Sequence, residues 1–480
     1  MSDTGVTVKK SEDFSEWYVE VILKAGLADY APVKGCMIIR EDAYAIWEKI
    51  QETFNQRIKA TGHRNVYFPL FIPESLLKKE AEHFAGFTPE VAWISQGGDN
   101  ELEEKVAIRP TSETIIYAAF SKWIRSWRDL PIKINQWCNI VRWETKSTRL
   151  FLRTREFLWQ EGHTAHASKG EAEAEVMYAL SEYRNIMENY LAIPVVAGVK
   201  SESEKFAGAV YTTSLEAMMP DGKALQMGTS HNLGQNFAKV FDVKYIGEDK
   251  MDHQVWQTSW GISTRLIGAM VMVHGDDKGL VIPPKVAPTQ VVIVPILFKI
   301  AEVAMIVAKA REIAETLRAK GFTVILDDRE EYTPGWKFNQ WELKGVPVRI
   351  EIGPRDLKQG QVVMVRRDNG QKAPVKEADI PVATERLLQE IQENLFAKAK
   401  VLMQNQTSIV QSYEEFKKVL CDKGGFLKAP WCGSAECEAK IKDETGATIR
   451  VLPFEKEELK TDCIYCGKKA KDTVYFARSY

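Results

Sequence analysis

The sequence predicts an α+β protein of several domains, and three observations carry this prediction. Residues 135–167 form two strand-like segments of polar and aromatic side chains around a basic loop, which is the pattern of a β-hairpin. A proline-rich segment at 283–288 precedes strand-like and helix-like segments in alternation, which indicates a separate mixed α/β unit. Two pairs of closely spaced cysteines near the C-terminus indicate a small metal-binding domain.

The composition excludes a disordered chain and carries no global signal for nucleic acid. With 480 residues, 45% of them hydrophobic, the chain can form several domains with cores of their own. The 64 basic and 66 acidic residues nearly cancel, so a nucleic-acid surface would have to be local. No apolar signal segment opens the chain, and the apolar run at 291–298 is too short to cross a bilayer. We therefore expect a soluble cytoplasmic protein with no membrane contact.

The predicted hairpin presents an unusual row of side chains. Period-2 alternation places Arg142 and Glu144 on one face of the incoming strand. On the returning strand one face carries Phe157, Trp159, Glu161 and His163. A strand facing a core would carry aliphatic residues there, because burying unpaired charges is costly. A solvated strand is the alternative, but it does not explain the large aromatic residues, so we predict a binding site. The loop cations, Lys146, Arg149, Arg153 and Arg155, suit phosphate.

The segments before the hairpin predict a helix, an edge strand and a second helix. Residues 41–60 place Trp47 and Phe54 on one helical face, which ends near Gly62. The following residues 63–77 read as a strand with two prolines, which are typical of an edge or an interface. Residues 107–114 then lead into a helix over 115–128, and by residue type alone Thr111 and Glu113 are the N-terminal cap of that helix.

The segments after the hairpin complete the outline. Residues 171–191 predict a scaffold helix. Residues 260–276 predict a glycine-interrupted apolar helix with Arg265 as its cation, whose partner is either a carboxylate or a polyphosphate. Further strands are expected at 291–296, 322–326, 346–352 and 361–366, and further helices at 301–320, 334–344 and 384–403.

The cysteine spacing predicts a structural zinc site. The pattern is Cys432-x4-Cys437 followed by Cys463-x2-Cys466, which suits four thiolates around a tetrahedral ion with no open position. Such a site contributes on the order of 10 kcal/mol to a small domain. The remaining cysteines are expected to be ordinary buried thiols: Cys36, Cys138 and Cys421.

Two other kinds of site are excluded by the motifs. The Gly-x4-Gly-Lys-Ser/Thr loop of P-loop nucleotide-binding proteins does not occur in the sequence. His163-x2-His166 with Glu161 resembles a metal-binding triad in composition, but residues three apart on a strand point to opposite faces. A catalytic metal at these histidines is therefore not expected.

Residues 142–167 also resemble a known family. Arg142-x-Glu144, the basic loop and Arg153-x3-Phe157 are similar to motif 2 of class II aminoacyl-tRNA synthetases, and the whole segment looks like the archaeal and eukaryotic type of prolyl-tRNA synthetase. The resemblance extends over nearly the whole chain. It implies an antiparallel class II sheet flanked by helices at 1–282, a mixed α/β anticodon-binding domain at 283–383, and a linker with a small α/β zinc-binding domain at 384–480. Motifs 1, 2 and 3 would cover about 62–73, 139–166 and 260–272, and motif 1 forms the dimer interface in the family, which implies a homodimer.

The resemblance also assigns candidate residues by position. The catalytic candidates are Arg142, Glu144 and Arg265. The candidates for proline are Thr111, Glu113, Arg142, Trp159, Glu161, His163, Phe206 and His231. The candidates for ATP are Arg142, Glu144, Arg153, Thr154, Phe157, Gln226, Thr229, Ser263 and Arg265. The anticodon candidates are Glu342, Arg349, Asp356 and Lys372, since carboxylates and arginine suit the edges of guanine.

The implied activity is that of a proline–tRNA ligase, with Mg²⁺ accompanying ATP. L-Proline and ATP would give prolyl-adenylate and pyrophosphate, and the prolyl group would pass to tRNA(Pro). The alternatives are a class II synthetase for another amino acid and a non-catalytic tRNA-binding paralogue. The span 167–260 is too short for the editing domain that bacterial-type relatives insert there. The family counterpart of Tyr480 approaches the active site, so a role for this residue is expected.

Overall fold

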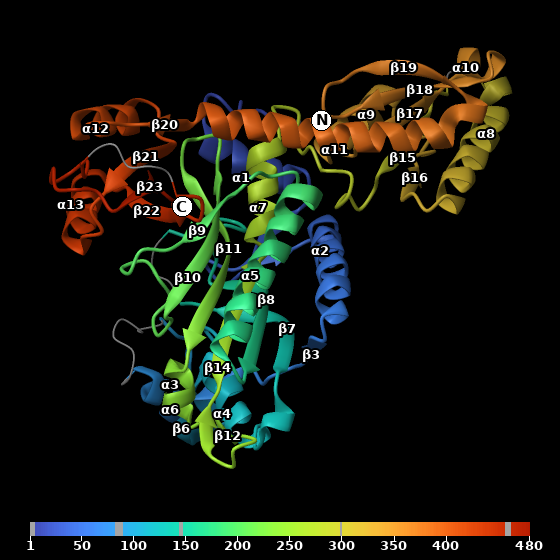
Figure 1. Ribbon diagram of the computed structural model, residues 1–480. Helices are drawn as coiled ribbons and strands as arrows, with labels where there is room; N and C mark the ends of the chain where they lie inside the picture. Colours follow the sequence, from blue (N-terminus) through green and yellow to red (C-terminus); the bar gives the residue numbers. More distant parts are fainter. Residues whose placement is uncertain (1–4, 82–89, 144–146, 298–299, 457–461) are drawn as a thin grey trace.

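A long, mainly antiparallel sheet runs through the computed structural model, which describes residues 5–81, 90–143, 147–297, 300–456 and 462–480 (Figure 1). Within this part of the chain the sheet has 11 strands, and only its outermost pairs are parallel. The strands in spatial order are β20 (Thr407–Ile409), β21 (Phe426–Trp431), β23 (Asp472–Ala477), β22 (Thr448–Pro453), β9 (Val196–Val199), β10 (Tyr211–Met218), β11 (Ala224–Gly234), β14 (Trp256–Ser263), β8 (Glu156–His166), β7 (Ile132–Val141) and β3 (Arg64–Asn65).

The predicted hairpin is confirmed. β7 pairs with β8 in an antiparallel register that sets Gln136 opposite Glu161 and Cys138 opposite Trp159. Arg142 lies just past the end of β7, so it is not on the strand itself as predicted. Glu144 and Lys146 lie outside the described residues.

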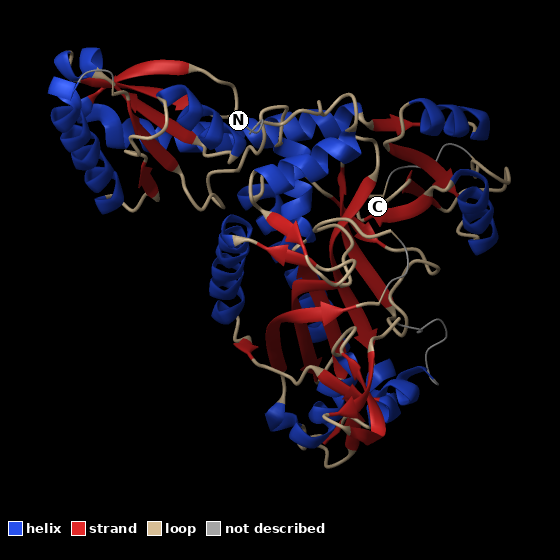
Figure 2. Ribbon diagram, turned by 180° about the vertical axis from the view of Figure 1, so that it is seen from behind, coloured by secondary structure: helices blue, strands red, loops and turns tan. Residues whose placement is uncertain are grey.

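Helices cover one face of this sheet. α5 (Lys169–Asn185) and its π-helical extension η2 (Ile186–Tyr190) lie across β11, β14 and β8, and together they match the predicted scaffold helix. The opposite face is crossed mainly by loops (Figure 2). The other helices of this region are α1 (Phe14–Lys24), α2 (Glu41–Ala60), α3 (Glu74–Ala81), α4 (Glu113–Trp123), α6 (Asn236–Phe241) and α7 (Arg265–His274).

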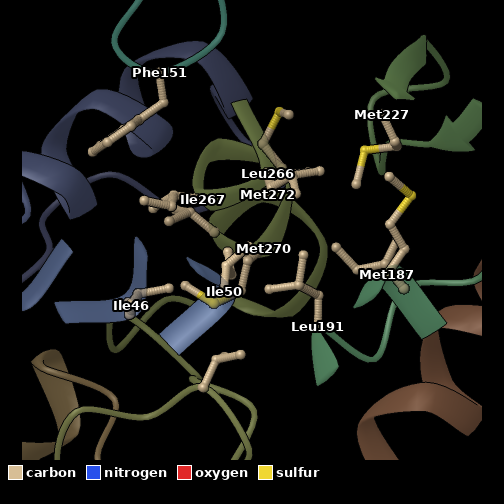
Figure 3. Packing of buried hydrophobic residues seen from close by; sticks show 14 of the residues in the cluster. Ile46, Ile50, Phe151, Met187, Leu191, Met227, Leu266, Ile267, Met270 and Met272 are labelled. Carbon is tan, nitrogen blue, oxygen red and sulfur yellow. The ribbon is translucent and has the colours of Figure 1, made fainter. Parts of the chain in front are cut away.

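The largest core cluster is built around α7. Its side chains meet those of α2, whose predicted bounds and apolar face are confirmed. Figure 3 shows Ile46 and Ile50 of α2 near Met270 of α7, with Leu191 closing the same cluster. Because these side chains are almost fully buried, their packing fixes α7 against the sheet and thereby fixes Arg265 at its first turn.

Two sequence predictions about single elements are wrong. The segment 63–77 is not one strand but β3, β4 (Phe71–Pro73) and the start of α3, since prolines interrupt the ladder. The segment 260–276 is not one helix: residues up to Ser263 belong to β14, and only Arg265–His274 is helical. Its apolar residues are buried on strand and helix alike, so composition could not separate the two states.

The predicted mixed α/β unit is also confirmed. Its five-stranded sheet has the order β16 (Val324–Leu326), β15 (Val291–Pro295), β17 (Val348–Ile352), β18 (Gln361–Arg366) and β19 (Lys372–Lys376). Its helices are α8 (Ile300–Ala319), α9 (Pro334–Leu343) and α10 (Pro354–Lys358). The long helix α11 (Ile380–Asn405) runs from this unit to the C-terminal strands (Figure 1).

The C-terminal region joins the large sheet directly. β22 pairs antiparallel with β9, where Pro453 lies opposite Gly198 and Leu452 opposite Val199. The helices there are α12 (Tyr413–Asp422) and α13 (Ala435–Thr445). Smaller ladders elsewhere pair β1 (Ala28–Tyr30) with β2 (Met37–Ile39), β12 (Lys244–Ile246) with β13 (Asp252–Gln254), and β5 (Trp93–Gly97) and β4 with β6 (Asn100–Ile108). Within the described part of the chain, no helix combines the length and the apolarity of a membrane span.

We predict that Gly198→Ala weakens the junction between β9 and β22. A Cβ atom at this position would lie 2.2 Å from the carbonyl oxygen of Leu452, so the two strands would have to separate. We expect a loss of about 1–3 kcal/mol in the free energy of unfolding, measured by denaturant titration. The matched control is Gly170→Ala in α5, where no atom lies within 4 Å of the new Cβ and no loss is expected. Equal stability of both variants would contradict the prediction.

Candidate active site

A cavity of about 280 Å³ opens on the face of the large sheet that α5 does not cover. Its floor comes from β8, β14 and β11, and its rim includes the N-terminus of α4 and the segment 200–206. The candidates for proline all line it: Thr111, Glu113, Arg142, Trp159, Glu161, His163, Phe206 and His231. The candidates for ATP that line it are Arg142, Phe157, Gln226, Thr229, Ser263 and Arg265.

Glu161 is buried on the floor and is held by several donors. The Ser112 hydroxyl donates to its Oε1 at 2.6 Å, and the Gln136 amide donates to the same oxygen at 2.8 Å. His163 Nε2 lies 2.9 Å from Oε2. Burial opposes the charge, but these donors outweigh it and hold the pKa of the Glu161 carboxyl below its usual range. Glu161 is therefore a fixed negative charge.

His163 continues this network away from the carboxylate. Its Nδ1 lies 3.1 Å from the hydroxyl of Tyr117, which is buried in α4. Because ionised Glu161 can only accept, Nε2 of His163 carries a proton toward it, while Nδ1 contacts the hydroxyl of Tyr117. The imidazole is thus held in one orientation by two neighbours.

His231 lies on the opposite side of the group of candidate residues for proline. Its Nδ1 lies 2.9 Å from Thr212 Oγ1, its Nε2 lies 3.1 Å from Thr229 Oγ1, and the Phe206 ring centroid is 4.7 Å from its own. Burial, together with nearby His163, lowers the pKa of His231 to about 3. His231 is therefore a neutral wall, in contrast to Glu161.

Arg142 lies between two aromatic rings at the rim. Its guanidinium is 5.6 Å from the centroid of Phe157 and 5.9 Å from that of Trp159, and the two rings meet edge to face. Its Nε donates to the carbonyl of Pro110 at 3.2 Å. The arginine is thus positioned by π contacts that leave its cationic group at the cavity surface.

Arg265 lies at the first turn of α7, in another part of the cavity lining. Its Nε donates to the carbonyl of Leu152 at 3.1 Å and its Nη1 to that of Gln226 at 3.4 Å. Both contacts are to backbone carbonyl oxygens, and they orient the guanidinium. Arg142 and Arg265 therefore give the cavity two oriented positive groups.

Three ATP candidates are not placed in the cavity lining. Arg153 and Thr154 lie in the connection before β8, and Thr154 donates through Oγ1 to the carbonyl of Glu156 at 2.7 Å. Thr154 thus shapes its own turn. Glu144, a catalytic candidate as well, falls outside the described residues.

The cap predicted at α4 takes a different form. Ser112 is the N-cap residue but makes no side-chain cap hydrogen bond, because its hydroxyl donates to Glu161 instead. The Thr111 hydroxyl donates to the carboxylate of Glu113. The side chains of residues 111–113 therefore interact with one another and with the cavity floor rather than with the helix end. The prediction that they act as an N-terminal cap is wrong.

Several residues of the site escaped the sequence prediction. Ser259, on β14, lies directly between His163 and His231 in the ladder, and its buried hydroxyl has no hydrogen-bond partner among the described residues. Thr212 and Lys200 also line the cavity. The alternation of β14 could have indicated Ser259, but Lys200 and Thr212 carry no local signal, since their place depends on the pairing of β10 with β9 and β11.

Comparison with known families identifies each part of this arrangement. Residues 93–274 match the tRNA synthetase class II core domain (G, H, P, S and T), residues 290–394 match an anticodon binding domain, and residues 413–480 match the prolyl-tRNA synthetase C-terminal domain. The proline–tRNA ligase of Natranaerobius thermophilus is 56% identical over 473 residues, which are 98% of this chain and 97% of that protein. That of Cenarchaeum symbiosum is 54% identical over 476 residues, 99% of each chain.

The chain belongs to the class II prolyl-tRNA synthetases. The predicted family and the predicted fold class are thereby confirmed, as a class II core followed by an anticodon-binding domain and a C-terminal domain. The individual binding roles of the cavity residues stay predictions.

The anticodon candidates of this prolyl-tRNA synthetase domain form one charged group, with one exception. Arg349 donates to Glu351 at 3.0 Å and to Glu342 at 3.4 Å, and Lys372 lies 3.1 Å from Glu351. Asp356 instead accepts from the backbone of Gly353 at 3.0 Å and so caps α10. Glu342, Arg349 and Lys372 therefore belong to one ion-pair network in which Arg349 is buried, whereas Asp356 has a structural contact of its own.

The four cysteines of the predicted metal site come together. The potential ligand atoms of Cys432, Cys437, Cys463 and Cys466 all lie within 4.8 Å of one another. The Sγ atom of Cys432 is 3.6 Å from that of Cys437 and 3.7 Å from that of Cys466. Thiolates on a tetrahedral zinc ion with bonds of about 2.3 Å are separated by roughly 3.8 Å, so the group is compatible with zinc.

The remaining cysteines differ from the prediction of buried thiols. Cys421 is exposed, and Cys36 and Cys138 are only partly buried. Cys138 lies beside the cavity network, where the Trp159 indole donates to its sulfur at 3.2 Å. Burial and the nearby charge of Glu161 raise the pKa of the Cys138 thiol to about 12, so it stays protonated.

Tyr480 lies near the basic loop of motif 2 but not in the cavity lining. Its hydroxyl donates to Asp221 at 2.7 Å, and the guanidinium of Arg149 is 5.7 Å from its ring centroid. Its position thus links the chain end to that loop.

We predict that His231 makes the protein less stable in acid. In the unfolded chain this histidine binds a proton below pH 6.5, whereas in the folded protein it binds one only near pH 3. The stability that the neutral histidine contributes is therefore fully present above pH 6.5 and is lost as the pH falls. At pH 5 this corresponds to about 2 kcal/mol. Denaturant titrations from pH 8 to 5 should therefore show a steeper decline for wild type than for His231→Asn. Parallel curves would contradict the assigned burial of a neutral imidazole.

Proposed function

We propose that this protein is a proline–tRNA ligase that forms prolyl-adenylate from L-proline and Mg-ATP and then transfers the prolyl group to tRNA(Pro). The observation that carries the proposal is the cavity itself. It combines fixed carboxylates, neutral aromatic walls and two oriented arginines on one sheet face. These are the groups that an amino acid with a secondary ammonium and a polyphosphate require.

The amino-acid half of the cavity suits proline. The carboxylates of Glu113 and Glu161 would face the ammonium of proline, and Thr111 orients Glu113. The ring methylenes would lie between Phe206 and Trp159, with His231 as a neutral boundary. The unpaired hydroxyl of Ser259 lies in the same part of the floor and would gain a partner from the bound substrate.

The first reaction step requires no nucleophile from the protein. A carboxylate oxygen of proline attacks the α-phosphorus of ATP in line, a new P–O bond forms, and the bond to pyrophosphate breaks. Arg142 would bridge the carboxylate and the α-phosphate, and Arg265 would hold the outer phosphates near Gln226, Thr229 and Ser263. Catalysis is then positioning and charge stabilisation. Mg²⁺, bound with ATP, would neutralise part of the phosphate charge.

Arg153, Thr154 and Glu144 complete the proposed ATP set, with Phe157 against the adenine. Transfer to the terminal ribose of tRNA follows, and the charged group of Glu342, Arg349 and Lys372 is proposed to read the anticodon together with Asp356. We also propose a homodimer through motif 1, which is supported by the exposed Tyr67, Phe71 and Trp93 on or near β4 and β5. The proposed domain limits are 282/283 and 383/384.

A class II synthetase for another amino acid and a non-catalytic paralogue are the alternatives. The neutral wall of Phe206 and His231 favours an apolar substrate ring over the hydroxyl of serine or threonine. Retention of Arg142 and Arg265 at the cavity favours an enzyme.

We predict proline-dependent exchange of pyrophosphate into ATP, and its loss in Arg142→Ala. Removing a cation that bridges the reacting groups should lower the exchange rate by at least about 10²-fold, while the circular dichroism spectrum stays that of wild type. The control is Arg125→Ala, an exposed residue outside the cavity. Exchange stimulated best by serine or threonine, or exchange that persists in Arg142→Ala, would overturn the proposal or the assigned role, respectively.

We also propose that the four cysteines bind one structural zinc ion. We predict about one zinc per chain by mass spectrometry of the purified protein, and loss of this metal in Cys466→Ser. Because the metal would stabilise a small domain, its removal should lower the midpoint of the first unfolding transition. The matched control, Cys421→Ser, changes an exposed cysteine outside the group and should keep the metal. Unchanged zinc content in Cys466→Ser would contradict the site.

A further inference from the structure

The segment 200–206 forms part of the cavity rim and is tied to the sheet at both ends by one residue. The backbone N–H of Lys200 donates to the carbonyl of Thr212 at 2.8 Å, and that of Phe206 donates to the Thr212 hydroxyl at 2.9 Å. Thr212 in turn contacts His231 at 2.9 Å. The position of this segment therefore sets the distance between Phe206 and the rest of the proposed proline pocket.

The middle of the segment is held by the C-terminal domain. The hydroxyl of Ser201 donates to Glu438 at 2.6 Å, and both side chains are almost fully buried. Glu438 belongs to α13 and directly follows the metal-ligand candidate Cys437. A second, more exposed pair joins Glu204 to Lys442 of the same helix at 3.5 Å. A buried polar contact between parts of the chain more than 230 residues apart thus fixes the rim.

A buried cluster of charged side chains also connects segment 200–206 with the C-terminal domain. Lys200 Nζ donates to Glu216 Oε1 at 2.7 Å, and Arg450 of β22 donates to Glu216 Oε2 through Nε at 3.0 Å and Nη2 at 2.9 Å. Burial opposes the charge of Glu216, but Lys200 and Arg450 outweigh it and keep the pKa of this carboxyl below its usual range. Burial also lowers the pKa of Lys200 below its usual value, against the opposing effect of Glu216. Lys200 lines the cavity that lies above this cluster.

The cluster is also connected to the part of the cavity that is proposed to bind the phosphates of ATP. Glu216 lies opposite Gln226 in the ladder of β10 and β11, and Gln226 contacts Arg265 through its carbonyl oxygen. Arg450 therefore occupies one end of a chain of contacts, and the cavity cations Lys200 and Arg265 occupy the other. Such buried networks are sensitive to the loss of a single member, because the remaining charges are left without a partner.

We propose that Glu438 and Arg450 of the C-terminal domain are positioning residues for the amino-acid pocket, acting through Ser201 and through Glu216 and Lys200. The inference rests on the proposed function of the cavity. It gives the C-terminal domain a role in substrate affinity, in addition to the structural role that is proposed for its four grouped cysteines. Loss of either contact releases segment 200–206, so that Phe206 and Lys200 no longer face the bound amino acid in a fixed position.

A purely structural role of these contacts gives a different result. It would lower the unfolding midpoint, and it would change the KM for proline and the KM for ATP together or not at all. The positioning role raises the KM for proline more than the KM for ATP, since segment 200–206 carries Phe206 of the amino-acid half. It leaves the unfolding midpoint of a conservative variant near that of wild type.

The experiment measures the KM for proline, the KM for ATP and kcat in pyrophosphate exchange by the full-length protein. For Glu438→Gln, and separately for Arg450→Met, we expect a rise of roughly ten- to hundredfold in the KM for proline and a smaller change in the KM for ATP. Arg450→Lys restores one donor to Glu216 and should recover part of the affinity. Binding of a non-reactive prolyl-adenylate analogue, measured by calorimetry, should weaken in parallel.

The matched control is Glu436→Gln, which changes an exposed carboxylate of the same helix that is paired only with Lys440 in the contacts shown. It should keep wild-type constants. Ser201→Ala should weaken proline binding as Glu438→Gln does, and the double variant should be no weaker than either single one. Wild-type KM values for proline in Glu438→Gln and Arg450→Met, with active wild-type enzyme, would overturn this inference alone. Absence of exchange in the wild type would instead overturn the proposed function.

Discussion

The burial of ionised Glu161 at the floor of the cavity is the constraint on which the rest of the site depends. A carboxylate without partners in such a place would be strongly destabilising. Ser112, Gln136 and His163 satisfy it from α4, β7 and β8, so three elements must meet in one register. The same register brings Trp159 and Arg142 to the rim. The geometry of the substrate side is thus a consequence of neutralising one buried charge.

The cavity is arranged as a contrast between charged and neutral groups. Glu161 stays ionised because its donors outweigh burial, whereas His231 stays neutral because burial and nearby His163 lower its pKa. The low-dielectric environment opposes charge in both cases, and the donors of Glu161 overcome it. An amino acid with a charged ammonium and an apolar ring fits this combination, with its ammonium on one side and its ring on the other, while the arginines face the anionic groups.

The C-terminal domain is continuous with the catalytic sheet and is not a separate appendage. β22 extends the ladder of β9, and Arg450 reaches into the interior of the larger domain. Close backbone contact at Gly198 admits no side chain, so the two parts are held at one distance. The four-cysteine group, the continuous sheet and the cavity rim therefore belong to one structural unit.

The sequence by itself determined those features that depend on local spacing. The hairpin face, the amphipathic α2, the β-α-β order of the anticodon-binding domain and the four grouped cysteines follow from periodicity or pair spacing, and the structure has them. Tertiary structure alone decided the end of β14 within an apolar run, the exposure of Cys421, the cavity positions of Thr212 and Lys200, and the contact of Arg450 with Glu216. These features depend on which strands are neighbours, and an apolar or charged residue carries the same local pattern whether its partner lies two or two hundred positions away.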